Sequence, residues 1–153
     1  MGFMLEWENT MREAKEAFNN KVFSVAIFLN KQALDLASER FDENVKIDAE
    51  KSVAAVMVSY FSLVDSYVEI RDFKQAYNIY QRSFDFLNIL MSTTYKSSNL
   101  ESAVSHAISH LKNEWGLFYK NHKDELKTMT TLLPNEFQSS LNTLMSSHSS
   151  VIH

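Results

Sequence analysis

Two histidines and a glutamate have the spacing that, in this sequence, most resembles a metal-binding site. His106, His110 and Glu114 follow one another at i, i+4 and i+8, so on a helix they would lie along one flank and could bind a divalent metal ion. The apolar stripe of the same segment contains Leu111 and Trp115, which puts His106 on the opposite side, in water. Because a catalytic metal needs a dry, shaped cavity, incidental histidines on a surface helix are the favoured interpretation. A metal-binding or enzymatic helical bundle that uses these three residues stays open as an alternative.

Other kinds of catalytic site find no support in the sequence. The chain has 153 residues with 2 Gly, 1 Pro and 0 Cys. Phosphate-binding loops and dinucleotide fingerprints need several glycines where the backbone approaches a ligand, and here there are only Gly2 and Gly116. The lack of cysteine removes thiol nucleophiles and thiolate metal sites, and nothing places a serine beside His and Asp. We therefore predict that the protein is not an enzyme and has no catalytic residues, no metal and no cofactor.

The same scarcity of glycine and proline indicates an all-α fold. Sheet-rich folds need frequent turn residues, whereas helices can be joined by Asn, Asp and Ser. Hydrophobic residues make up 45% of the chain, and its length suits one domain with a substantial core. We predict a single helical domain over residues 1–153, with about five to seven helices.

Charge and hydropathy indicate in which compartment the protein is located and which kinds of partner it does not bind. Fifteen Lys and Arg residues against nineteen Asp and Glu residues give a formal net charge of −4, which offers no basic footprint for nucleic acid. No apolar run is long enough to span a membrane, and Met1 to Asn9 lack the basic and apolar regions of a signal peptide. The lack of cysteine suits a reducing compartment. These features predict a cytoplasmic protein that binds neither nucleic acid nor membranes.

Apolar spacing divides the first two thirds of the chain into two helical hairpins. The first hairpin covers residues 1–40 with a turn at Asn19-Asn20, and the second covers residues 48–91 with a turn at Arg71-Asp72. Asp48 can cap the first helix of the second hairpin, because its carboxylate can accept a free backbone N–H. Between the hairpins, the polar stretch from Phe41 to Lys46 loosens the helical pattern.

The last third of the chain gives a strong helical signal followed by a weak one. An apolar stripe from Leu100 to Phe118 predicts a fifth helix. Shorter helices are expected around residues 123–132 and after Pro134, whose fixed φ suits the first turn of a helix. The C-terminal helices would thus cover residues 99–147, and residues 148–153 would form a frayed tail.

The two hairpins are related by a constant shift in the sequence. With a shift of 50 residues, Phe23 falls on Phe73, Ala26 on Ala76, Ala33 on Ser83, and Asn20-Lys21 on Ile70-Arg71. In each hairpin the small residue would let two helices approach closely, while aromatic residues fill the wedge beside the contact. Two hairpins of the same design are expected to stack and to bury a shared core.

This pattern resembles the tetratricopeptide repeat. The matching residues are Tyr60, Leu63, Val64, Tyr67, Phe73, Ala76, Tyr80 and Ser83 in the second hairpin and Ala14, Ala17, Phe23, Ala26 and Ala33 in the first. The departures are Thr10 and Asn30, Lys21 and Arg71 in place of small glycines, and a period longer than the 34 residues of the family. The resemblance implies antiparallel helical hairpins stacked as a right-handed superhelix, and a plain helical bundle is the alternative.

The resemblance also implies where a partner binds. In repeats of this kind the first helix of each hairpin presents one face to the core and another to a concave groove, and Phe61 is a large aromatic residue on that second face. The expected groove residues are Met11, Arg12, Lys15, Phe18, Asn19, Val58, Phe61, Ser62, Asp65, Val68 and Glu69. The alternative is that a neighbouring or C-terminal helix covers this face.

The function implied by the resemblance is the binding of another protein. We expect a peptide or protein segment to dock in the groove through apolar anchors and a few charges, as in an adaptor or a secretion-type chaperone. A further hypothesis is a structural homo-oligomer that buries the Phe61 face against a second copy of the chain.

Overall fold

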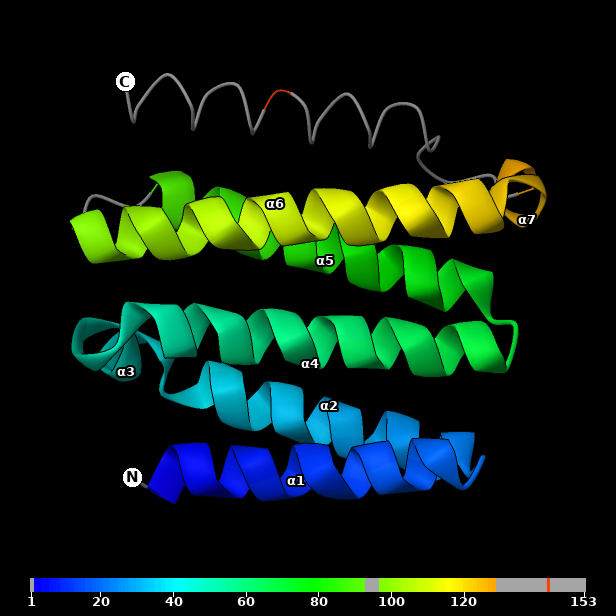
Figure 1. Ribbon diagram of the computed structural model, residues 1–153, viewed down its shortest axis with the longest axis horizontal. Coiled ribbons are helices and arrows are strands. Elements are labelled where there is room, and N and C mark those ends of the chain that lie inside the picture. The colour runs from blue at the N-terminus through cyan, green and yellow to red at the C-terminus, as the bar shows by residue number, and fades with distance from the viewer. Residues whose placement is uncertain (1, 93–96, 129–142, 144–153) are drawn as a thin grey trace. The chain divides into compact units, whose positions relative to one another are not determined.

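The computed structural model describes residues 2–92, 97–128 and 143, and these residues form α-helices joined by short turns, with no strand among them (Figure 1). The prediction of an all-α fold is confirmed. In chain order, the helices are α1 (Gly2–Asn19), α2 (Phe23–Glu39), α3 (Phe41–Ile47), α4 (Ala49–Glu69), α5 (Phe73–Ser92), α6 (Ser98–Asn121) and α7 (Lys123–Lys127). None of these helices is both long enough and apolar enough to cross a membrane.

The helices group into two compact units. Unit 1 comprises Met1–Tyr80 and unit 2 comprises Gln81–His153, so the boundary lies within α5. In unit 1, α2 packs against both α1 and α4, and α3 packs against α4. In unit 2, α7 packs against α6.

The core of unit 1 lies where α2 meets α4. Ala26 and Ala33 of α2 are completely buried, as is Leu63 of α4, and Val56 and Val64 beside it are at most 2% exposed. Because an alanine side chain ends at Cβ, the branched side chains of α4 can pack close to the backbone of α2. The small residues that the sequence predicts for the close contact of the first hairpin are therefore core residues.

The turns that end α1 and α4 have the same geometry. Lys21 and Arg71 have φ values of 63° and 61°, in the left-handed region. The Val22 and Lys21 N–H groups donate to the Ala17 and Phe18 carbonyls at 2.9 and 3.0 Å, and the Asp72 and Arg71 N–H groups donate to the Tyr67 and Val68 carbonyls at 2.9 Å each. Both turns are Schellman motifs. Lys21 and Arg71 correspond to each other under the shift of the predicted repeat.

Polar side chains cap α4, α5 and α6. Asp48 accepts a hydrogen bond from the Lys51 N–H at 3.0 Å, Asp72 from the Gln75 N–H at 3.2 Å, and Ser97 from the Leu100 N–H at 3.1 Å. Each cap satisfies one of the N–H groups that the first turn of a helix leaves without an intrahelical partner. The cap predicted for Asp48 is confirmed.

The short helix α3 departs from the sequence prediction. We expected a loosened pattern between Phe41 and Lys46, whereas this stretch lies within a helix. Phe41 is only 8% exposed and anchors the helix, and Asp42 and Glu43 in its first turn suit the positive end of a helix dipole. A helix of seven residues is too short for an apolar period to stand out in the sequence.

In unit 2, α6 presents the apolar stripe that the sequence predicts from Leu100 to Phe118. Leu111 and Trp115 are completely buried, and the Trp115 ring lies 5.7 Å from that of Phe118, between centroids. The short α7 lies at the start of the helix expected around residues 123–132. The helix expected after Pro134 and the frayed tail lie outside the described residues, apart from residue 143, which is helical.

Candidate functional site

A groove in unit 1 lies between α1 and α4. These two helices run in the same direction, and α2 runs in the opposite direction (Figure 1). Since α1 and α4 both pack against α2, α2 supplies the floor where the other two helices separate. The groove has a volume of about 570 Å³, which lies within the usual range of ligand-binding sites.

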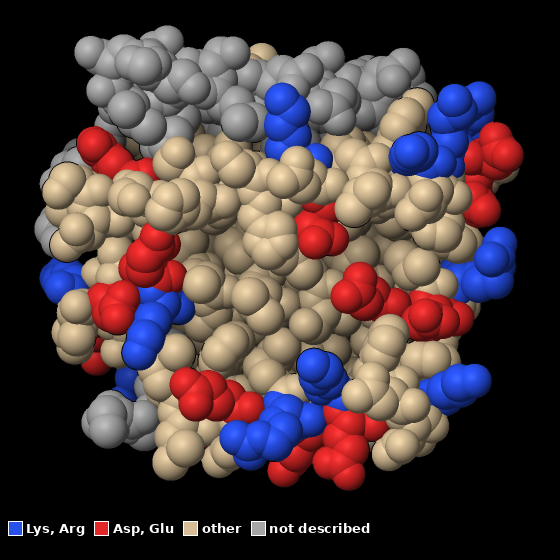
Figure 2. Space-filling model, viewed as in Figure 1, with Lys and Arg blue, Asp and Glu red and all other residues tan. Residues whose placement is uncertain are grey.

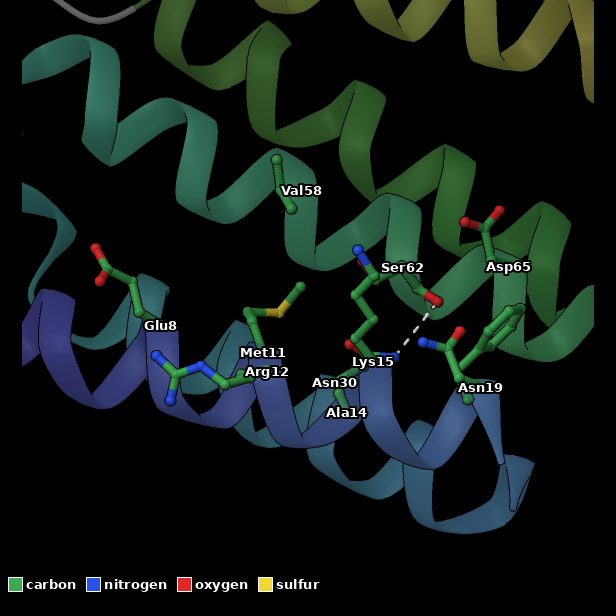
Figure 3. Close-up of a pocket in the computed structure, with 11 residues that line it drawn as sticks. Glu8, Met11, Arg12, Ala14, Lys15, Asn19, Asn30, Val58, Ser62 and Asp65 are labelled. Carbon is green, nitrogen blue, oxygen red and sulfur yellow. Dashed lines mark hydrogen bonds between the residues drawn. The ribbon is translucent and has the colours of Figure 1, made fainter. Parts of the chain in front are cut away.

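The lining of the groove combines apolar and charged side chains (Figure 3). The lining residues are Glu8, Met11, Arg12, Ala14, Lys15, Phe18 and Asn19 from α1, Asn30 from α2, and Val58, Ser62 and Asp65 from α4. Met11, Phe18 and Val58 offer apolar contacts to a ligand. Basic side chains stand on the α1 wall and Asp65 on the α4 wall, so a ligand would meet both signs of charge.

The α1 wall is anchored at both ends. Near the N-terminal end, Trp7 Nε1–H donates a hydrogen bond to Ser59 Oγ at 2.8 Å, and the Ser59 hydroxyl donates to the Ala55 carbonyl at 2.7 Å. Near the C-terminal end, the rings of Phe18 and Phe23 meet edge to face, with 5.4 Å between their centroids. The first contact ties α1 to α4 and the second ties α1 to α2, so the groove is preformed.

Asn30 is the polar residue on the floor. It is 2% exposed, and its Nδ2–H donates to the Ser62 carbonyl and to Ser66 Oγ, at 3.4 Å each. Both distances are long for hydrogen bonds of this kind. The Asn30 Oδ1 atom is buried and accepts no hydrogen bond from the described residues. The groove therefore has an unpaired acceptor beneath it.

Lys15 supplies an unpaired charge above that floor. Figure 3 shows its side chain reaching from α1 towards α4, between Glu8 at one end of the groove and Asp65 at the other. In the part of the chain that the structure describes, its ammonium group makes no hydrogen bond and no ion pair. Arg12, one turn earlier, already donates to Asn9 Oδ1 at 2.9 Å on its own helix. Both cations of the α1 wall can therefore meet a ligand, and Lys15 is the one that has no hydrogen-bond partner among the described residues.

Most of the predicted groove residues come together in this groove. The structure places Met11, Arg12, Lys15, Phe18, Asn19, Val58, Ser62 and Asp65 in its lining. Val68 is half-buried and Glu69 is exposed, and neither lines this groove.

Phe61 requires a correction, because it is a core side chain and does not line the groove. It is 8% exposed. Successive residues of a helix are about 100° apart, so Phe61 lies about 60° around α4 from Val58, on the flank next to the buried Met57. The sequence misleads here because α4 is apolar around most of its circumference, and an aromatic residue away from the main stripe need not face water.

Sequence reasoning missed three of the lining residues, which are Glu8, Ala14 and Asn30. A signal for Asn30 was present. It interrupts the apolar face that Ala26, Ala33 and Ala37 form on α2, and a polar residue on such a face calls for an explanation. In the repeat pattern Asn30 is only a departure from a large apolar residue, and that pattern does not predict a binding residue there.

His106, His110 and Glu114 lie on the solvent side of α6. His110 Nε2 is 3.4 Å from Glu114 Oε1, with exposed fractions of 54% and 36% for the two side chains, and His106 is also exposed. No group of three or more His, Asp or Glu side chains within the described ranges could hold a metal ion. The exposed positions agree with the interpretation of a surface helix.

The charged side chains around the groove are of both signs. On the face shown in Figure 2, acidic and basic side chains alternate along α1, at the bottom of the view. Neither sign gathers into a continuous patch along this helix, whereas a nucleic-acid-binding surface is typically a basic stripe.

Comparison with known proteins supplies a family but no activity. No curated protein and no solved structure matches the chain. A protein family matches residues 5–147, a range that includes α2, α4 and every residue lining the groove. The chain therefore belongs to the family described as protein of unknown function, DUF2753.

Proposed function

We propose that this protein is a non-catalytic, tetratricopeptide-like module that binds a peptide or protein segment, as an adaptor or a chaperone-like protein would. The observation that carries the proposal is the preformed groove between α1 and α4. Because contacts at both ends hold α1 in place, a ligand would not have to order this wall on binding. A site that is ordered in advance binds more tightly for the same contacts.

The likeness of the two hairpins supports the repeat-like part of this proposal. Ala26 and Ala76 are both completely buried, and so are Ala33 and Ser83 at the next corresponding pair. The two Schellman turns follow the same shift. The helix α3, which lies between the hairpins, accounts for part of the excess over a 34-residue period.

The length of the groove suits a short extended segment. From Glu8 to Asn19 the α1 wall is about 16 Å long at 1.5 Å per residue, which an extended segment of about five residues would span. Such a segment offers main-chain N–H and C=O groups to the groove, whereas a helix pairs most of these groups within itself.

The lining favours binding over catalysis. It contains no histidine, and its carboxylates, Glu8 and Asp65, are both exposed and belong to opposite walls. General acid and base catalysis depends on titrating groups in a protected position next to the reacting atoms. We accordingly propose neither an enzymatic activity nor a cofactor, and we retain the cytoplasmic location that the sequence predicts.

The proposal is tested by filling the groove with a bulky side chain. Ser62 is half-buried on the α4 wall, so Ser62→Trp should obstruct the groove without opening the core. A displayed library of random 12-residue peptides is selected on the full chain, and the affinities of selected peptides are measured by calorimetry. We expect Ser62→Trp to weaken their binding at least tenfold.

Ser24→Trp is the matched control, because Ser24 is exposed on α2 and does not line the groove. It should leave the same affinities within twofold of the wild type. If no peptide is enriched, or if both variants bind the selected peptides equally well, the groove is not a peptide-binding site.

A further inference from the structure

We propose that the groove recognises an extended segment of a partner protein that carries an acidic side chain at its centre. A main-chain N–H of the segment donates to Asn30 Oδ1, and the acidic side chain pairs with Lys15. This inference rests on the proposed function, and it adds the chemistry of the partner.

The unpaired oxygen of Asn30 calls for a donor. Its amide nitrogen is turned towards the Ser62 carbonyl, which can only accept, and the Ser66 hydroxyl also donates to that carbonyl, at 3.2 Å. The opposite orientation of the amide would place two carbonyl oxygens against each other, so Oδ1 is left as the free acceptor. Every residue of an extended peptide other than proline offers an N–H for such an acceptor.

A ligand can reach this oxygen after a small side-chain movement. Oδ1 is buried in the free protein, although Asn30 belongs to the lining of the groove. Met11 and Lys15 line the same groove, and both have long, unbranched side chains that rotate readily. Their rotation can open the floor while the backbones of α1, α2 and α4 keep their positions.

The order of charges along the groove places the acidic residue of the ligand at the centre. Glu8 and Asp65 stand towards the two ends, and Lys15 lies between them (Figure 3). A carboxylate at the Asp65 end would meet a like charge, and at the Glu8 end it would meet Glu8 together with Arg12, whereas at the centre it would meet the ammonium group of Lys15. Met11 and Val58 offer apolar contacts to the neighbouring side chains of the segment.

The presence of Asn30 on an otherwise apolar face agrees with a binding role. A leucine of similar size would complete the face formed by Ala26, Ala33 and Ala37 without leaving an acceptor unpaired. Local choices that conflict with the fold tend to occur at functional sites. An acceptor that is paired only in the complex accounts for this residue.

The test uses synthetic heptapeptides with acetylated and amidated ends, random except for a central Glu, Ala or Lys. Capping the ends removes the terminal charges, so the three pools differ only at the central residue. Binding to the ¹⁵N-labelled full chain is followed through the Asn30 side-chain amide signals. We expect the Glu pool to bind about threefold more tightly than the Ala pool, as for one exposed ion pair, and the Lys pool to bind most weakly.

Charge reversal at Lys15 tests the pairing directly. Lys15→Glu should reverse the order, so that the Lys pool binds more tightly than the Glu pool. Lys112→Glu is the control, because it makes the same charge change at an exposed position of α6 and should keep the wild-type order. An unchanged order in Lys15→Glu would overturn the role of Lys15.

Methylation of single peptide nitrogens tests the bond to Asn30. In a Glu-centred heptapeptide resolved from the pool, each main-chain N–H is replaced in turn by N–CH₃. At one position the change should weaken binding to the wild type about tenfold, as expected when a buried acceptor loses its donor. The same change should have little effect on Asn30→Leu, because that variant has no acceptor to lose.

The possible results separate this inference from the proposed function. If none of the three pools shifts a groove resonance, both fail. If the pools bind equally well, or if methylation has the same effect in Asn30→Leu as in the wild type, peptide binding stands and the acidic-segment inference fails. Concentration-dependent shifts of the Asn30 amide without peptide would identify a second copy as the occupant, and Overhauser contacts from it to residues beyond 128 would identify the chain's own segment. Either observation would overturn the inference.

Discussion

At the scale of residues, a single buried side-chain amide gives the groove an unpaired hydrogen-bond acceptor. Asn30 lies on a face of α2 that is otherwise lined by small apolar side chains, and its oxygen has no donor among the described residues. An unpaired acceptor of this kind typically costs about 1–3 kcal/mol. The free protein thus carries a local instability beneath the site where a ligand would bind.

We expect Asn30→Leu to raise the free energy of unfolding by roughly 1–2 kcal/mol, because the variant removes the unpaired acceptor and loses only two long hydrogen bonds. Urea unfolding followed by circular dichroism measures the change. The control is Gln32→Leu, an exposed position on the same helix, which should change stability little. A destabilised Asn30→Leu variant would mean that the Asn30 hydrogen bonds outweigh the unpaired oxygen.

Phe61 gives a second prediction at this scale, now as a core residue. Phe61→Ala should lower the free energy of unfolding by about 3 kcal/mol or more, through lost burial and the cavity left behind. Phe28→Ala is the matched control, since Phe28 is 63% exposed on α2, and it should cost far less. Equal losses in the two variants would contradict the burial of Phe61.

The sequence predicts the groove-lining residues more accurately on α1 than on α4. On α1, the predicted groove residues are the counterparts of those on α4 under the repeat, and all of them line the groove, namely Met11, Arg12, Lys15, Phe18 and Asn19. On α4 both faces carry apolar residues, and periodicity could not show on which side Phe61 would be buried. The sequence marks Asn30 as a polar residue on an apolar face of α2, but the direction of its amide depends on the packing of α2 against α4, which spacing along one helix does not contain.

At the scale of elements, the two helical turns carry residues that local conformation disfavours. Lys21 and Arg71 adopt left-handed φ values, which residues with a Cβ take up only at an energetic cost. The hydrogen bonds of the Schellman motifs hold them there. These turns are therefore points where a local substitution can stabilise the fold.

Lys21→Gly should raise the free energy of unfolding by roughly 0.5–1 kcal/mol, because glycine adopts the left-handed conformation without steric strain. The gain is limited because glycine loses more backbone entropy on folding. Arg71→Gly should gain less, since the Arg71 guanidinium lies 5.1 Å from the centre of the Phe73 ring and this contact would be lost. Urea unfolding of both variants and of Lys21→Ala provides the comparison. If Lys21→Ala stabilises as much as Lys21→Gly, backbone conformation is not the cause.

The long helices and their turns could be predicted because each rests on a local signal. Apolar stripes mark α1, α4 and α6, and Asp48 marks the start of α4. The helix α3 could not be predicted in this way, because it depends on the burial of Phe41, a property of the folded unit.

At the scale of the whole molecule, each of the two units contains one of the two tryptophans of the chain. Trp7 belongs to unit 1, where it is half-buried and bonded to Ser59. Trp115 belongs to unit 2 and is completely buried. Fluorescence can therefore follow the two units separately, and it can test the single domain that the sequence predicts.

We expect the two units to unfold together, because α5 is one continuous helix that belongs to both and a helix of this length depends on packing along its sides. In Trp115→Phe, the fluorescence of Trp7 should show the same urea midpoint as circular dichroism of the whole chain. Trp7→Phe gives the reciprocal measurement on Trp115. Separate midpoints within one variant would identify two independently folding domains.

The left-handed Lys21 and Arg71 also make the hairpins sensitive to salt. Neither α1 nor α4 has a basic residue in its last turn, so these two side chains are the cations placed next to the negative ends of the two helix dipoles. Dissolved ions screen this attraction, with a Debye length of about 10 Å at 0.1 M and about 3 Å at 1 M, whereas they leave steric strain in the backbone unchanged. At 1 M salt the attraction between each cation and its helix dipole should thus be lost, while the strain of the left-handed backbone remains. A glycine at either turn would therefore raise the free energy of unfolding more at 1 M salt than in dilute buffer.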